Sequence, residues 1–162
     1  MNRIRVIALP VGIAALALTP IVLAAPAEAS TTAGGCTLTP GRPVASGLFT
    51  PAGDPLISYP ITAVCPIGVT VEANQRRMDQ DTWAREMNRP DDLMGQTTVF
   101  FDFTAAGGTK VATVLAVTVP TGPALELNDE EAYNDLSFRV TSGAVVTPWT
   151  AREMSAITVV PD

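Results

Sequence analysis

The sequence predicts an all-β protein: an antiparallel β-sandwich with Ig-like or Greek-key connections, one disulfide and at most one short helix. Short runs of alternating apolar and polar residues recur along the chain, separated by turns rich in Gly, Pro and Asn or Asp. These runs, the sparse helical periodicity and a single pair of cysteines are typical of an exported sandwich domain. A closed barrel is the alternative architecture.

Residues 1–29 have the composition of a signal peptide. A short basic start leads into an apolar run at residues 6–25, and Ala27-Glu28-Ala29 provides the small residues that precede a cleavage site. An uncleaved membrane anchor is the alternative, but Pro10 and Pro20 would interrupt its helix. We therefore expect an exported protein that is secreted or held at the cell surface.

One mature domain is expected at residues 36–162, after a flexible leader of small and polar residues at 30–35. Its length suits a single hydrophobic core. The whole chain carries a formal net charge of −6 and has no histidine. Because negative charge is repelled by phosphate and by anionic lipid, we expect no nucleic-acid partner, and no membrane partner after signal cleavage.

Cys36 and Cys65 are the only cysteines of the chain. Export places them in an oxidising compartment, where an isolated pair is far more often a disulfide than a metal site or two reactive thiols. We predict a Cys36–Cys65 bridge that clamps a proline-interrupted first strand to the next strand.

The first half of the mature domain predicts three strands. Residues 37–44 suit an edge or irregular strand because prolines interrupt them, and residues 51–55 read as a turn. Residues 57–64 and 68–73 follow, and the second of these alternates apolar with polar side chains, which indicates one buried and one solvent-facing side.

Residues 76–88 are the one candidate helix. Trp83 and Met87 are four residues apart, and Pro90 would end the helix shortly afterwards. The same segment reads equally well as a long polar loop.

Residues 96–104 predict the clearest strand of the chain. Phe101 and Phe103 fall on one side of this strand, and Phe100 falls on the other.

A hairpin turn at residues 105–108 is expected to lead into a central strand at 109–119, which is rich in β-branched residues and apolar on both sides. Residues 128–131 have the Asn-x-x-Glu form of a capping box and could open one helical turn. Later strands are expected at residues 136–141, 144–147 and 156–160.

No catalytic residue emerges from the sequence. Without histidine, the Ser-His and Cys-His pairs that activate nucleophiles are missing. Lys110 is the only lysine and has no serine motif beside it, so we interpret it as a solvated charge. A carboxylate pair for glycoside hydrolysis stays open as an alternative, although no particular pair is singled out. We expect a non-enzymatic protein without a cofactor.

An acidic cluster provides weak calcium candidates in Asp129, Glu131 and Asp135. The cluster lacks the spacing and the glycine of an EF-hand loop. We therefore favour a solvated run of charges over a metal site.

Several short motifs occur in a fixed order between Cys36 and about Thr141. They are Cys36 itself, Gly47-Leu48-Phe49, Asp54-Pro55-Leu56, Cys65, Val69-Thr70-Val71, Arg76-Arg77-Met78, the apolar strand at 93–103, and Ala132-Tyr133-Asn134-Asp135. In this order they resemble the spore coat protein U family, which includes coat proteins and the pilins of archaic chaperone-usher systems. The resemblance implies a non-enzymatic, Ig-like coat or appendage subunit in which the cysteines form a structural bridge.

The chain departs from that family at both ends. Residues 30–35 lack the alternating apolar segment that such pilins donate to a neighbour. The chain also continues past the family's usual final strand, and we expect residues 155–160 to complete its own sandwich. A monomer or weak self-association follows, with other cell-surface or coat proteins as partners.

Two other functions stay open. A secreted binding module or inhibitor would act on a protein partner through an exposed apolar patch at Trp83, Met87, Leu93 and Met94. A carbohydrate-active protein is the more distant alternative, because the chain has only two tryptophans.

Overall fold

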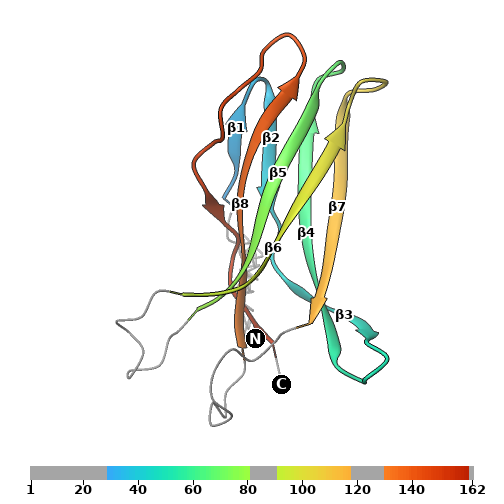
Figure 1. Cartoon of the computed structure of the whole chain (residues 1–162), viewed down its shortest axis with the longest axis vertical. Coiled ribbons are helices and arrows are strands. Elements are labelled where there is room, and N and C mark those ends of the chain that lie inside the picture. The colour runs from blue at the N-terminus through green and yellow to red at the C-terminus, as the bar shows by residue number, and fades with distance from the viewer. Residues whose placement is uncertain (1–28, 81–90, 118–129, 161–162) are drawn as a thin grey trace, which may run out of the picture.

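Two antiparallel sheets face one another in the computed structural model, which describes residues 29–80, 91–117 and 130–160 (Figure 1). Sheet A contains β1 (Thr31–Ala33), β2 (Cys36–Pro40), β3 (Val44–Phe49), β4 (Pro55–Cys65) and β7 (Gly108–Val117). Sheet B contains β5 (Thr70–Asp79), β6 (Asp92–Asp102), β8 (Glu130–Ser142), β9 (Glu153–Met154) and β10 (Thr158–Val160). The described residues contain no helix, so the predicted all-β antiparallel class is confirmed.

Strand β4 is the centre of sheet A. One edge of β4 pairs with β7 along the length of the strand. The other edge pairs with β3 near the start of β4 and with β2 near its end. Strand β1 pairs with β2 and extends the sheet. Since β4 and β5, β6 and β7, and β7 and β8 each lie in different sheets, the chain changes sheet repeatedly, as in Ig-like and Greek-key sandwiches.

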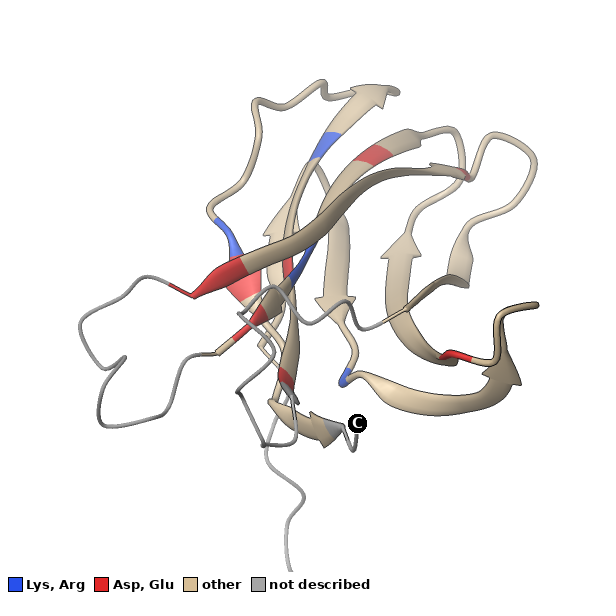
Figure 2. Cartoon of the chain, turned by 60° about the horizontal axis from the view of Figure 1, so that its bottom comes forward, with Lys and Arg blue, Asp and Glu red and all other residues tan. Residues whose placement is uncertain are grey.

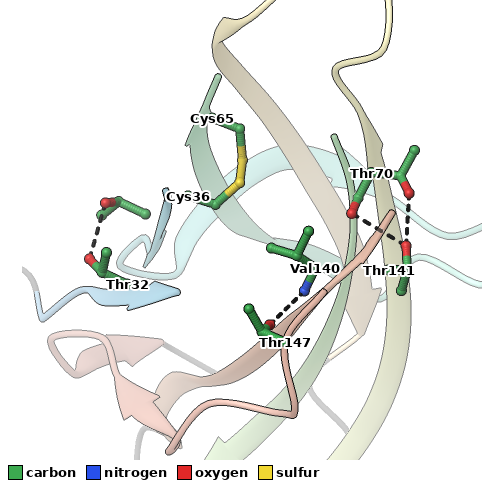
Figure 3. The surroundings of a disulfide bond; sticks show 8 residues. Thr32, Cys36, Cys65, Thr70, Val140, Thr141 and Thr147 are labelled. Atoms are coloured by element: carbon green, nitrogen blue, oxygen red, sulfur yellow. Dashed lines mark hydrogen bonds between the residues drawn. A yellow bond between two sulfur atoms is a disulfide. The ribbon is translucent and has the colours of Figure 1, made fainter. Parts of the chain in front are cut away.

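Strands β5 and β8 form the centre of sheet B. Strand β6 pairs with the free edge of β5, while β9 and β10 both pair with the free edge of β8. Residues between β8 and β9 in the sequence also bond to the edge of β8. The Thr147 N–H donates to the Val140 carbonyl oxygen at 3.1 Å. The Val140 N–H donates to Thr147 Oγ1 at 2.9 Å (Figure 3). The C-terminal strand expected at 156–160 is present as β10, whereas 144–147 is irregular.

The prediction of a helix at residues 76–88 is wrong for its first turn, residues 76–79. Residues 76–79 are the end of β5 and pair with β6 on one side and β8 on the other. Pairing on both sides overrides the weak local helical signal. Residues 81–90 lie outside the described part, as do residues 128 and 129 of the proposed capping box, while Glu130 and Glu131 begin β8 instead of a helix.

The flexible leader predicted at residues 30–35 is a hairpin. Thr31–Ala33 forms β1, and Ala33 pairs with Cys36 across a two-residue turn. Gly34 and Gly35 make this turn with φ angles of 57° and 81°. Two successive positive φ angles suit the tight hairpin turn that glycine adopts without strain.

The hairpin predicted at residues 105–108 is also wrong. Strand β6 pairs with β5 in sheet B, and β7 pairs with β4 in sheet A, so this segment crosses between the sheets. Gly107 is needed there for close approach, because a Cβ at this position would lie 2.6 Å from the Ile67 backbone nitrogen. Among the residues that the structure describes, β7 pairs with β4 alone, so it lies at an edge of sheet A and not in the central position expected from its sequence.

The predicted disulfide is present. Cys36 of β2 and Cys65 of β4 lie opposite one another in sheet A and are bonded (Figure 3). Around it the inward side chains of both sheets form the main core, whose buried members include Leu38, Val71 and Phe138. The bridge therefore ties β2 to the long central strand β4 beside this core.

A smaller core lies at the other end of the sandwich, around Ile57, Tyr59 and Ala132. A buried polar layer joins the sheets beside Tyr59. Gln75 and Asn134, both fully buried, hydrogen-bond to each other at 2.7 Å between Gln75 Nε2 and Asn134 Oδ1. These amides also donate to main-chain carbonyl oxygens of sheet A, which fixes the relative position of the two sheets.

Candidate functional site

The outer face of sheet B carries paired charges. Glu72 Oε2 and Arg139 Nη2 are 2.7 Å apart, and Asp135 Oδ2 lies 3.2 Å from Arg152 Nη1 and 3.9 Å from Arg76 Nη1. Each carboxylate thus faces one or two guanidinium groups. These five charged side chains therefore partly neutralise one another.

A shallow hollow of about 470 Å³ lies on the same face. Its lining residues are Asn74, Gln96, Ser137, Trp149, Thr150 and Arg152. Arg152 Nη2 donates to Asn74 Oδ1 at 2.5 Å, so the guanidinium is already held by neighbours. The hollow offers amide and hydroxyl groups and the half-exposed ring of Trp149, and its six lining residues include no His, Lys, Asp or Glu to act as a general base toward Ser137.

Trp149 lies against a cation. The Arg139 guanidinium carbon is 5.0 Å from the centroid of the Trp149 ring. This cation–π contact, together with the Glu72–Arg139 pair, holds Arg139 on the outer face of sheet B. Trp149 therefore covers part of the outer face of sheet B.

The outer face of sheet A has a different character. Strand alternation places the buried residues of β2 and β4 inward, so the intervening residues and their partners on β7 face outward. The outward residues are Thr37, Thr39, Leu56, Ser58, Pro60, Thr62, Val64, Thr109, Val111, Thr113, Leu115 and Val117. We call this set the uncharged face, because it contains no Asp, Glu, Lys or Arg.

The contrast between the sheets extends to whole strands. Within the described strands of sheet A, Lys110 is the only charged residue. In Figure 2 the charged segments follow the strands of sheet B, while those of sheet A are almost entirely tan. The strands of sheet A also expose apolar side chains. Phe49, Val111 and Leu115 are 65%, 63% and 45% exposed. Sheet A therefore presents a large uncharged surface to solvent.

The predicted partner-contact residues are not brought together. Trp83 and Met87 lie outside the described residues. Leu93 is half exposed on β6, but Met94 turns inward and packs against the smaller core, so it is not available to a partner. Strand alternation sends the two neighbours to opposite sides.

The weak calcium candidates are placed differently from a metal site. Asp135 faces Arg152 and Arg76, whose positive charges compete with a cation for its oxygens. The backbone N–H of Glu131 donates to Asp79 Oδ1 at 3.1 Å, and Asp129 lies outside the described part. In the ranges the structure describes, no group of three or more His, Cys, Asp or Glu side chains is arranged to hold a metal.

Sequence reasoning missed the contact between Tyr133 and Asp91. The Tyr133 hydroxyl donates to Asp91 Oδ2 at 2.5 Å. Burial, and then the hydrogen bond and charge of Asp91, raise the pKa of Tyr133 well above its ordinary value of 10.0. Only the tertiary fold brings these residues together, so no local pattern could have revealed the pair.

The geometry defines a disulfide-bonded β-sandwich protein with one charged face and one uncharged face. A scan against protein-family models found no match, and searches of curated proteins and of solved structures found none either. Among the described residues, no helix is long and apolar enough to cross a membrane.

Proposed function

We propose that the protein is an exported, non-enzymatic structural or surface protein that attaches to a coat or cell-surface protein through the uncharged face of sheet A. The observation that carries this proposal is the contrast between the sheets. The outer face of sheet B carries charged side chains that pair with one another. The described strands of sheet A contain one charged residue, Lys110.

Physical chemistry favours this surface for contact. The centre of a protein–protein interface is typically depleted of charged residues, because each buried charge has to be desolvated. The outward threonines and serine can exchange hydrogen bonds with a partner, while Val111 and Leu115 contribute apolar area. The disulfide supports the proposal as well, because such bonds persist in oxidising compartments.

Charge insertion tests the proposal. Thr62→Lys places a cation in the middle of the uncharged face on β4, and Thr98→Lys places the same cation on the outer face of sheet B. Both variants and the native protein are produced in the source organism, and the fraction bound to the cell or spore surface is compared with the fraction in the medium.

We expect Thr62→Lys to move most of the protein from the surface fraction to the medium, with Thr98→Lys distributed like the native protein. A native protein that stays inside the cell contradicts export. Equal surface binding of all three proteins contradicts attachment through sheet A. Circular dichroism of the purified variants checks that both keep the fold.

The hollow beside Trp149 favours a second candidate function, binding of a neutral saccharide. One exposed ring face, amide groups and a neutralised arginine are the groups that sugars contact in shallow sites. Titration of the protein with neutral oligosaccharides, followed by tryptophan fluorescence, tests it. A response that survives Trp149→Ala would contradict this site.

A further inference from the structure

We propose that β7 pairs edge to edge with β7 of a second copy of this chain, which joins two copies of sheet A into one continuous sheet. The inference goes beyond the proposed function, since it concerns the backbone edge of sheet A and not its outer face. It begins from the pairing of β7: within the described residues, this strand pairs with β4 alone.

An unpaired edge strand exposes a row of N–H and C=O groups that can pair with another chain. Strand β7 is ten residues long and pairs with β4 from Gly108 to Val117 without a bulge. It contains no proline. Its N–H and C=O groups that point away from β4 therefore form a long and regular template.

The other edges of the two sheets have features that discourage such pairing. Strand β1 has three residues, β9 two and β10 three, and β3 has six with a register shift between Ala45 and Phe49. Strand β6 is as long as β7, but it has a register shift opposite Arg77 and Met78 and begins and ends with aspartates, Asp92 and Asp102. Short strands, bulges and charges are the devices with which proteins protect edges. Residues 111–117 of β7 have no bulge, no charge and no proline that would protect this edge.

The one charge on β7 protects only its first residues. Lys110 Nζ donates to the Asp102 carbonyl oxygen and lies 5.1 Å from the centroid of the Phe103 ring. Both contacts hold the ammonium group at the start of the strand. The remaining residues, Val-Ala-Thr-Val-Leu-Ala-Val, are uncharged.

A second copy of β7 is a suitable occupant because the strand is self-complementary about Thr113. A two-fold axis at Thr113 pairs residues 109–117 with the same residues of the other copy in antiparallel order. On the outer face, Val111 then lies opposite Leu115 of the second copy, so the two most exposed apolar side chains of β7 cover each other.

The same register separates the positive charges. Lys110 faces Ala116 of the second copy, and the two lysines are at opposite ends of the paired strands. No like charges are opposed, and the outward pairs are Thr with Val, Val with Leu, and Thr with Thr. Pairing of this limited extent predicts a weak dimer that dissociates on dilution.

Sedimentation velocity over a concentration series of the purified protein tests the pairing. The native protein is expected to form a dimer that dissociates on dilution. Thr113→Lys puts two lysines directly opposite each other and is expected to weaken the dimer by roughly tenfold or more. Thr39→Lys is the matched control, because it adds the same charge to the same face on β2, on the other side of β4, and is expected to change the dimer less than about twofold.

Charge rescue separates an interface effect from misfolding. Thr113→Glu alone is expected to be monomeric like Thr113→Lys, and an equimolar mixture of the two is expected to regain the dimer. A native protein that stays monomeric, a Thr113→Lys variant that dimerises like the native protein, or a mixture without rescue overturns the proposal. Slow hydrogen exchange of the outward β7 amides in a monomer would overturn it too, because another segment of the chain would then cover the edge.

A native protein that stays monomeric but attaches normally to the surface would contradict this pairing alone. A native protein that dimerises but does not attach to the surface would contradict the proposed function alone.

Discussion

The Asn134 side chain of sheet B donates from Nδ2 to the Pro60 carbonyl oxygen of sheet A at 3.0 Å. The same nitrogen donates to the Gly41 carbonyl oxygen at 2.9 Å, and the Asn134 Oδ1 accepts from Gln75. One fully buried amide therefore joins β8, β5, β4 and the connection that follows β2. It acts as a polar clamp between two otherwise apolar surfaces.

Asn134→Ala is expected to destabilise the fold by about 3 kcal/mol, because it removes a donor to the Gly41 and Pro60 carbonyl oxygens and the acceptor of the buried Gln75 amide. Asn74→Ala is the matched control on the outer face of sheet B, where the loss is expected to be under about 1 kcal/mol. Urea unfolding measures both. Similar losses for the two variants would show that Asn134 is not a clamp.

Removal of the disulfide is expected to lower the free energy of unfolding by about 3 to 4 kcal/mol, since Cys36 and Cys65 are 29 residues apart and the bridge restricts the unfolded chain. The double variant Cys36→Ala, Cys65→Ala is compared with the native protein by chemical denaturation. Free thiols in a non-reducing peptide map of the native protein would contradict the bridge itself.

Strand alternation predicts opposite outcomes for Phe100, which lies in β6, and Phe103, which directly follows the strand. Phe100 is 72% exposed, and Phe103 is fully buried. Phe103→Ala is expected to cost about 3 to 5 kcal/mol, and Phe100→Ala less than about 0.5 kcal/mol. Thermal and urea unfolding check this pair, and a larger loss for Phe100→Ala would mean that β6 has the other side inward.

The Tyr133–Asp91 contact predicts a pH dependence in the alkaline range. The pKa of Tyr133 is raised in the folded protein above its unfolded value near 10, so the stabilisation is complete below pH 10 and decreases as pH rises towards the folded pKa. Tyr133→Phe lacks this proton and is expected to lose less stability between pH 9 and about pH 12. Urea midpoints across this range measure the difference.

At neutral pH the Tyr133→Phe variant is expected to be less stable by about 1 kcal/mol, because the hydrogen bond to Asp91 is lost. Stability curves of native protein and variant that run parallel from pH 9 upwards would contradict the raised pKa.

The sequence predicted those features that local pattern determines. Alternation in residues 96–104 placed Phe101 and Phe103 on one side of the strand and Phe100 on the other, and the structure shows the first side buried and Phe100 exposed. The cysteine pair was predicted from the export signal and the compartment, and it is bonded. The alternation depends on residues that are close in sequence. The cysteine pairing was simple because each cysteine has only one possible partner.

Features that depend on distant segments were missed. Residues 76–79 are strand because β6 and β8 pair with them, although the nearby Trp83 and Met87 spacing resembles a helix. Gly107 looked like part of a hairpin turn, but its role is the close approach to Ile67. A Gly-Gly pair between Ala33 and Cys36 was a readable hairpin signal that the prediction of a flexible leader overlooked.

The uncharged face could have been read only after the strand pairing was known. Each of its strands contributes a few Thr, Val or Leu residues, and none of these is unusual alone. Register brings them side by side on one surface. The candidate site is thus a property of the sheet and not of a sequence motif.

Hydroxyl-radical footprinting tests contact through sheet A most directly. The surface-bound protein and the purified protein are oxidised in parallel, and modification of individual side chains is measured by mass spectrometry. We predict that Val64, Val111 and Leu115 are protected in the bound protein, whereas Phe100 of β6 and Trp149, which covers the outer face of sheet B, react equally in both. Protection of Phe100 and Trp149 with unchanged reactivity on sheet A would contradict the account.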